Sequence, residues 1–298
     1  MSYSTEGIAV DKGDVVTVRH AESVGFTNWI KIEYKGWQFG HVASDVENLT
    51  GGKNSDTLTG NDMTNTLIGG PGNDTLDGKG GQPDHLVGGP GNDTLGGGPA
   101  GSPSDVLDGG ADSDIVTYAS RTDGVYVLLN GASGGEDTIL GVENAEGGSG
   151  DDHVLGTDGP NAVFGNGGND NIGGSGGNDT PRGGEGADYM NGWNGVGTVT
   201  YDDYTVPVTV TVDGKGNDGA AGEGDNVDQS VEILIGGQKG DTLTGNDLAN
   251  WIYGGPGNDK LFGLGGNDML DGQAGTDTVD GAADTDTCVA ETRANCEK

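Results

Sequence analysis

Apolar residues recur along much of this chain at intervals of nine, each between two polar or small residues. From Gly236 the sequence divides into the segments GGQKGDTLT, GNDLANWIY, GGPGNDKLF, GLGGNDMLD, GQAGTDTVD and GAADTDTCV. Their eighth positions are Leu243, Ile252, Leu261, Leu270, Val279 and Cys288. A lone apolar residue with such neighbours is typical of a short strand whose middle side chain points inward. Each segment therefore predicts a turn plus a strand, and two segments predict one coil of a solenoid.

The same pattern occurs in two earlier blocks, which start at Gly51 and Gly147. In the first block, the inward positions are Leu58, Leu67, Leu76, Leu86, Leu95 and Leu107. A Val-Glu pair precedes each block, and each non-repetitive insert begins at a tyrosine: Tyr3, Tyr118 or Tyr201. The expected parts are an N-terminal insert rich in aromatics (1–45), a first block (46–117), an insert (118–141), a second block (142–200), an insert (201–230) and a third block with a C-terminal cap (231–298).

The junctions before the inserts share a sequence, which bears on the length of the array. Ile115–Tyr118 reads IVTY and Thr198–Tyr201 reads TVTY, and the opening Met1–Tyr3 looks like the truncated end of such a junction. This similarity predicts that the chain is the C-terminal part of a longer array of blocks.

The sixth position of nearly every segment is an aspartate, which is a candidate metal ligand. These residues are Asp56, Asp74, Asp84, Asp93, Asp105, Asp114, Asp152, Asp170, Asp179, Asp188, Asp241, Asp259, Asp268, Asp277 and Asp286. The second segment of each block has asparagine there instead: Asn65, Asn161 and Asn250. Those turns either hold an ion through a neutral ligand or hold none; the second is favoured because asparagine tolerates left-handed turns.

Composition gives the aspartates a use. The chain has 48 acidic and 13 basic residues and a formal net charge of -35, which excludes a nucleic-acid-binding protein. With 31% hydrophobic residues and one inward apolar residue per nine, the chain cannot offset its backbone entropy unaided. Calcium takes about 6–8 oxygen ligands from carboxylates and carbonyls. We therefore expect bound Ca²⁺ to fold the chain, and the calcium-free chain to be largely disordered.

The segments Gly69–Asp74, Gly88–Asp93 and Gly254–Asp259 all read GGPGND. The pattern G-G-x-G-x-D-x-(apolar)-x resembles the RTX family of secreted calcium-binding repeats, also called hemolysin-type repeats. The resemblance implies an all-β fold, a right-handed parallel β-roll or β-helix solenoid, with calcium between stacked turns. If a block of n turns holds n − 2 ions, about thirteen ions would bind and cancel about 26 of the excess negative charges.

The resemblance also implies an extracellular or cell-surface protein with a structural or spacer role. Relatives carry such repeats behind protease, lipase or sugar-epimerase domains. An alternative is therefore the C-terminal folding and export module of a larger enzyme or toxin, and another is a surface adhesin. No catalytic residues are expected, because His20, His41, His85 and His153 are scattered without triad or metal-ligand spacing. His85 and His153 follow a candidate ligand directly and are expected to be exposed. No membrane-spanning segment is expected either.

The two later inserts contain alternating or β-branched runs, 125–129 and 206–212, which predict short β-hairpins. In the last insert, Glu223, Asp225 and Asp228 either form a cation site or lie in a solvated acidic loop, and we favour the loop. The N-terminal insert concentrates aromatics at residues 26–39, with Arg19, Lys31 and Lys35 nearby. These residues form either a surface for a glycan or cell-surface partner or, as we favour, a small hydrophobic core.

Two further features concern the ends of the blocks. Pro181 occupies an inward strand position and Gly197 replaces the last aspartate of the second block, so the sites at Asp179 and Asp188 are expected to be weakest.

Cys288 and Cys296 are expected to form a disulfide that covers the open end of the solenoid in an oxidising compartment, and the alternative is two free thiols.

Overall fold

The computed structural model describes residues 46–129, 131 and 136–296, together with four short strands that precede them. In this part of the chain all regular elements are β-strands, and no helix occurs. The chain forms two compact units, residues 1–146 and 147–298. In the described residues there is no helix long and apolar enough to cross a membrane.

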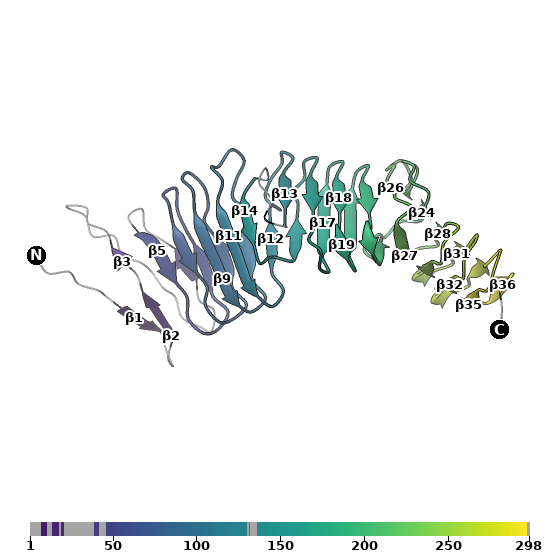
Figure 1. The fold of residues 1–298 in the computed structure, drawn as a ribbon, viewed down its shortest axis with the longest axis horizontal. Helices are drawn as coiled ribbons and strands as arrows, with labels where there is room; N and C mark the ends of the chain where they lie inside the picture. Colours follow the sequence, from purple (N-terminus) through teal and green to yellow (C-terminus); the bar gives the residue numbers. More distant parts are fainter. Residues whose placement is uncertain are drawn as a thin grey trace, which may run out of the picture. The chain divides into compact units, whose positions relative to one another are not determined.

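The first unit is built from two parallel sheets whose strands alternate along the sequence (Figure 1). One sheet has the order β4 (Phe39–His41), β6 (Thr57–Thr59), β8 (Thr75–Asp77), β10 (Thr94–Gly96), β12 (Ile115–Thr117) and β15 (Asn144–Glu146). The other has the order β3 (Arg19–His20), β5 (Val46–Thr50), β7 (Thr66–Ile68), β9 (His85–Pro90), β11 (Val106–Ala111) and β14 (Thr138–Leu140). Among the described strands of this unit, β3 pairs antiparallel with β5, and β1 (Gly7–Val10) with β2 (Asp14–Thr17).

The second unit repeats this arrangement. Its sheets contain β16 (His153–Leu155), β18 (Asn171–Gly173), β21 (Tyr189–Asn191) and β26 (Asn226–Val227); β17 (Ala162–Gly167) and β20 (Thr180–Glu185); β23 (Gly197–Thr200), β27 (Val231–Ile235), β29 (Trp251–Tyr253), β32 (Met269–Asp271) and β35 (Thr287–Val289); and β25 (Gly219–Ala220), β24 (Val208–Thr211), β28 (Thr242–Thr244), β31 (Lys260–Phe262), β34 (Thr278–Asp280) and β36 (Thr292–Ala294). Short pairs in the turns join β19 (Gly176–Gly177) to β22 (Asn194–Gly195), and β30 (Pro256–Gly257) to β33 (Ala274–Gly275).

Strands two segments apart pair in register, so two segments make one coil. Leu58 lies beside Leu76 and Leu76 beside Leu95, while Leu243 lies beside Leu261. A register shift by one residue would turn every apolar side chain outward, so the repeat itself fixes the pairing. The prediction of an all-β parallel solenoid is therefore confirmed.

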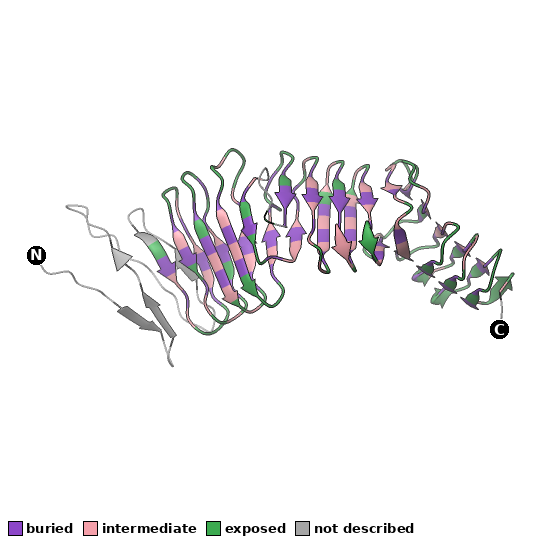
Figure 2. Cartoon of the chain, in the orientation of Figure 1, coloured by how far each residue is buried: buried purple, intermediate pink, exposed green. Residues whose placement is uncertain are grey.

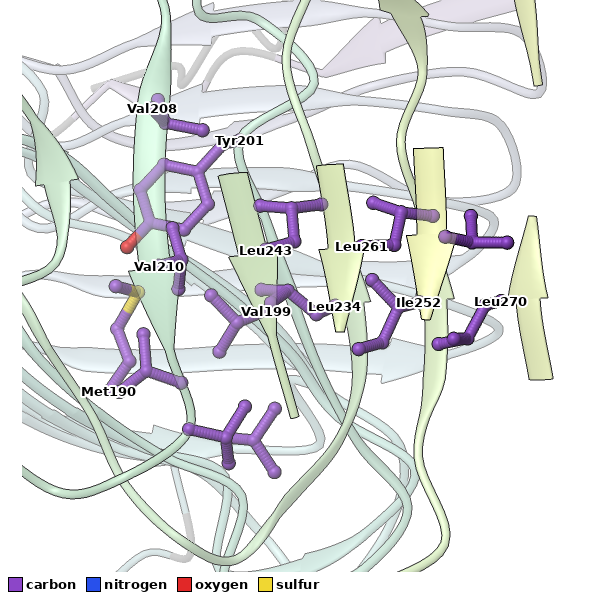
Figure 3. Close-up of a cluster of buried hydrophobic side chains, with 14 of the residues drawn as sticks. Met190, Val199, Tyr201, Val208, Val210, Leu234, Leu243, Ile252, Leu261 and Leu270 are labelled. Atoms are coloured by element: carbon purple, nitrogen blue, oxygen red, sulfur yellow. The ribbon is translucent and has the colours of Figure 1, made fainter. Parts of the chain in front are cut away.

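The core is a double row of the eighth-position side chains. All the predicted inward residues of the first and third blocks are buried, and the strands alternate between buried and more exposed positions (Figure 2). In Figure 3, Leu243 and Leu261 from one sheet face Leu234 and Ile252 from the other. Pro181 is also buried inside its strand and pairs with Val163, as the sequence predicts.

From the third turn of each block onward, most turns place a left-handed residue at the second and fourth positions of the segment. Gly91, a fourth-position glycine, has φ 133°, and a Cβ on it would lie 1.8 Å from the Gly72 carbonyl oxygen of the coil before. Both the conformation and the close approach require glycine there. Stacked turns therefore place a backbone carbonyl of one coil against the Cα of a glycine in the next.

The inserts continue the stack. In the last insert β24 pairs antiparallel with β25, which confirms the predicted hairpin. In the middle insert β13 (Tyr126–Leu128) forms, and the Glu136 N–H donates to the Tyr126 carbonyl at 2.8 Å, so the chain doubles back. The aromatic cluster predicted at residues 26–39 lies outside the described residues, apart from the backbone of Phe39.

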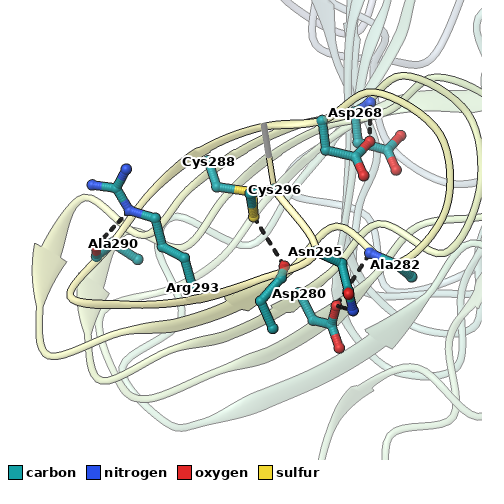
Figure 4. Close-up of a disulfide and its surroundings, with 10 residues drawn as sticks. Asp268, Asp280, Ala282, Cys288, Ala290, Arg293, Asn295 and Cys296 are labelled. Atoms are coloured by element: carbon teal, nitrogen blue, oxygen red, sulfur yellow. Dashed lines mark hydrogen bonds between the residues drawn. A yellow bond between two sulfur atoms is a disulfide. The ribbon is translucent and has the colours of Figure 1, made fainter. Parts of the chain in front are cut away.

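Cys288 and Cys296 form the predicted disulfide, with 5.9 Å between their Cα atoms (Figure 4). Cys288 comes from β35 and is buried, while Cys296 follows β36. Nearby, Asn295 donates from Nδ2 to Asp280 Oδ1 at 2.7 Å. The bond therefore joins the last strands of the solenoid to the segment that follows them.

Candidate metal sites

The fifteen candidate aspartates are all buried, and each directly precedes a strand. This position follows from the segment: the first five residues form the turn, the aspartate ends it, and the strand begins at the seventh residue. Stacking of the coils then arranges the aspartates in rows along the edges of each unit.

In the later turns, one oxygen of the aspartate accepts a hydrogen bond from the previous coil. The Asp56 N–H donates to Asp74 Oδ1 at 2.7 Å, and the Asp74 N–H donates to Asp93 Oδ1 at 2.7 Å. In the second unit the Asp241 N–H donates to Asp259 Oδ1 at 2.8 Å. The aspartate carboxylates therefore accept hydrogen bonds from backbone N–H groups that are not paired between strands.

The hydrogen bonding of the second side-chain oxygen differs between the first two turns of a block and the turns that follow. In first turns it accepts the second-position N–H of its own turn, as at Asp152 and Asp241, both at 2.7 Å. In the asparagine turns Oδ1 accepts that same bond, at 2.7 Å for Asn65, Asn161 and Asn250. These turns are closed by their own side chain. Whether the asparagine turns bind an ion stays a prediction.

In most later turns, Oδ2 is buried and accepts no hydrogen bond. This holds for Asp74, Asp84, Asp93, Asp114, Asp170, Asp179, Asp188, Asp259 and Asp268. Burying a carboxylate oxygen without a partner costs several kcal/mol unless a cation or proton compensates it. These atoms are therefore suited to a hard cation.

Carbonyl oxygens lie close to the same atoms. A Cβ on Gly88 would lie 2.3 Å from Asp93 Oδ2 and 2.6 Å from the Gly109 carbonyl oxygen. A Cβ on Gly165 would lie 2.2 Å from Asp170 Oδ2 and 2.4 Å from the Gly183 carbonyl oxygen. The first-position glycine thus leaves a space in which a carboxylate of one turn and a carbonyl of the next coil converge.

Side chains alone do not make a metal cluster here. Among the described residues, no group of three or more His, Cys, Asp or Glu side chains is placed to hold an ion. The carbonyl oxygens beside the aspartates are further candidate ligands, which suits calcium, since it accepts about 6–8 oxygens from carboxylates and carbonyls. The residues fit this ion: the aspartates would hold it together with turn carbonyls, and when bound it supplies the positive charge that the buried carboxylates lack.

The electrostatics agree with this assignment. Burial raises the pKa of Asp170 to about 7, and neighbouring aspartates add to the rise, while the Asp152 N–H opposes it. Burial likewise raises the pKa of Asp74 and Asp259 to about 6. Without a cation, these groups would compete for protons near neutral pH.

The structure adds row members that the sequence interpretation missed. Asp137 and Asp225, from the inserts, accept the N–H groups of Asp105 and Asp188 at 2.8 and 3.0 Å. On the other edge Glu143, Glu232 and Glu291 accept the N–H groups of Asp114, Gly197 and Asp277 at 2.8–2.9 Å. The sequence shows one sign of this role, because Asp137–Leu140 reads DTIL, like the end of a repeat.

The structure corrects the expectation of a solvated acidic loop at Asp225 and leaves the expected weakness of two calcium sites untested. Asp225 does not lie in a solvated loop: it is fully buried, because it continues a row. His85 is exposed as expected, whereas His153 is half-buried. Asp179 and Asp188 have the same geometry as other row members, so the weakness expected for their sites stays a prediction.

A parallel β-solenoid with rows of buried carboxylates beside turn carbonyls defines a class of metal-binding repeat proteins. The family model of the RTX calcium-binding nonapeptide repeat matches residues 50–83, 80–99, 100–120, 146–181, 182–199, 235–270 and 253–288. The chain belongs to this family and is a calcium-binding repeat protein. Comparison with curated proteins finds no matching relative.

Proposed function

We propose that the chain is an extracellular, non-enzymatic protein that folds on binding about ten or more Ca²⁺ ions and serves as a structural or spacer element. The fifteen repeat aspartates are the proposed carboxylate ligands. The observation that carries this proposal is the set of buried Oδ2 atoms without a hydrogen-bond partner in the later turns. Affinities of about 10⁻⁴–10⁻³ M are expected, as in other extracellular calcium modules.

The fold supports the coupling of binding to folding. One inward apolar side chain per segment gives a core only two rows wide, while each later turn buries a carboxylate that needs compensation. Binding energy then becomes folding energy, and the ordered state depends on the metal. We propose three such blocks, residues 46–117, 142–200 and 231–298, separated by the inserts.

Far-UV circular dichroism during a calcium titration tests the proposal, with bound metal counted by elemental analysis after dialysis. The expected result is a cooperative transition from coil to β near millimolar calcium, with about ten or more ions per chain. A chain that is already folded in chelator, or that binds only a few ions, would contradict it.

The alternative is a folding and export module at the C-terminal end of a larger secreted enzyme or toxin. The membership of the chain in the RTX calcium-binding repeat family supports this alternative. Sequencing of the complete gene distinguishes the two, since a catalytic domain encoded upstream would support the module.

A further inference from the structure

Two aspartates of the inserts continue the rows but differ from the repeat aspartates in their second oxygen. Asp137 and Asp225 accept the N–H of the preceding row member through Oδ1, as any repeat aspartate does. Their Oδ2 atoms, however, accept hydrogen bonds from tyrosine hydroxyls, Tyr118 at 2.6 Å and Tyr201 at 2.9 Å. In most later turns of the repeats, Asp170 and Asp188 among them, the same atom accepts none.

The two pairs are built in the same way from different sequences. Tyr118 and Tyr201 are the first residues of their inserts and are 1% and 2% exposed. The Tyr118 N–H donates to the Glu146 carbonyl at 2.8 Å, and the Tyr201 N–H to the Ile235 carbonyl at 2.9 Å. Each tyrosine is therefore anchored to a strand of its own unit, with its ring buried and its hydroxyl directed at the last carboxylate of a row.

From this geometry we propose that the Tyr118–Asp137 and Tyr201–Asp225 pairs end the calcium rows without a metal ion. The hydroxyl donates to the oxygen that would otherwise face a cation, and a neutral donor satisfies a buried carboxylate where no further turn supplies carbonyl ligands. The inference rests on the proposed function, because it assigns two places in the rows at which calcium does not bind.

The pairs also explain why the inserts begin with tyrosine. A phenylalanine would fill the same volume but leave a carboxylate oxygen of a fully buried residue, Asp225, unpaired. The repeats themselves do not supply the hydroxyl, because their inward positions carry aliphatic side chains or Pro181, Met190 and Cys288, none of which has one.

The first test counts calcium bound at saturation, by equilibrium dialysis and elemental analysis, in Asp225→Asn and in a matched variant of the same row, Asp170→Asn. Asparagine keeps an acceptor oxygen for the ladder bond but removes the charge. The full-length D225N chain is expected to bind as many ions as the unaltered chain, whereas D170N is expected to bind at least one fewer.

Loss of an ion in D225N comparable to that in D170N would overturn the inference while leaving the calcium-folded solenoid intact. If neither variant loses an ion, the repeat aspartates are not ligands. The proposed function then fails at Asp170, and the inference falls with it. The two failures are therefore distinguishable.

The second test compares Tyr201→Phe with Tyr253→Phe, which changes a partly exposed residue of β29. In saturating calcium, Y201F is expected to shift the unfolding equilibrium toward the unfolded state by about tenfold or more, because it leaves a buried carboxylate oxygen unpaired. Y253F is expected to be close to the unaltered chain. Equal urea midpoints for the two variants would show that the hydroxyl does not satisfy Asp225.

Discussion

At the scale of single residues, the left-handed conformation belongs to the position in the segment more than to glycine. Leu264, Gln273 and Ala282 occupy second positions and have φ values of 77°, 64° and 70°. An L residue pays roughly 1–2 kcal/mol for this conformation. The conformation alone therefore does not exclude a side chain, but at Gly91 the Gly72 carbonyl oxygen lies against the Cα and leaves no room for a Cβ.

Gly91→Ala tests the close approach. Its Cβ would lie 1.8 Å from the Gly72 carbonyl oxygen, so we expect a loss of roughly 2–3 kcal/mol in stability, measured by urea unfolding in saturating calcium. Gly96→Ala is the matched control, because its Cβ would have 3.5 Å to its nearest neighbour. Its effect should stay within about 1 kcal/mol. Similar losses for both would contradict the proposed steric role of the fourth position.

The raised pKa values of the row aspartates predict that protons partly replace calcium. For Asp170 the folded-state pKa is about 7 and for Asp74 about 6, above the usual 3.8. A raised folded-state pKa gives stability that is present below the unfolded pKa and is lost as pH rises through the folded pKa. The metal-free chain should therefore gain β signal in circular dichroism between pH 8 and pH 4, mostly below pH 7.

The calcium-loaded chain should show the opposite trend, since protons and calcium compete for the same carboxylates. The calcium midpoint is expected to rise as the pH falls from 7 to 5. A metal-free chain whose spectrum does not change over this pH range would contradict the prediction.

At the scale of elements, each strand contributes one buried side chain, so single truncations in the core should be costly. Leu261→Ala removes a fully buried side chain from β31 and should destabilise the calcium-loaded protein by about 2–5 kcal/mol. Leu248→Ala changes a turn residue that is 61% exposed and should stay within about 0.5 kcal/mol. Thermal unfolding of the two variants measures the difference, and equal midpoints would argue against a core of stacked single residues.

The elements themselves were predictable, but the ends of the rows were not. The nine-residue period predicts the strand, its inward residue and the ligand position, because every segment packs against its neighbours in the same way. Asp137, Asp225 and Glu291 lie outside the period, and their roles arise only when the coils are stacked. Glu291 takes the place of a row aspartate, and Tyr118 lies 19 residues before Asp137 in the sequence. Neither contact follows from the repeat pattern, because each forms only in the folded chain.

At the scale of the whole molecule, the C-terminal end is the one place where a covalent bond closes the solenoid. The Cys288–Cys296 disulfide joins residues separated by eight positions, a closure worth about 2–3 kcal/mol in a chain-entropy account. In the double variant Cys288→Ser, Cys296→Ser, amide hydrogen exchange of β34–β36 should accelerate. Strands β16–β18 of the second block serve as the internal control and should be unchanged. Equal acceleration in both regions would mean that the bond stabilises more than its own end.

The rows of hydrogen bonds have a direction along the chain. Each amide finds its acceptor in a carboxylate that comes later in the sequence, as Asp241 does in Asp259 and Asp259 in Asp277. Shortening the protein from its beginning removes donors, and the carboxylates left behind can turn to water. Shortening it from its end removes acceptors, so buried N–H groups of the preceding coil lose their hydrogen-bond partners. Truncation is therefore expected to be tolerated better at the start of a row than at its end. The features that complete the rows and the last coil lie at those later ends: the Tyr118 and Tyr201 hydroxyls, the glutamates Glu143, Glu232 and Glu291, and the Cys288–Cys296 disulfide.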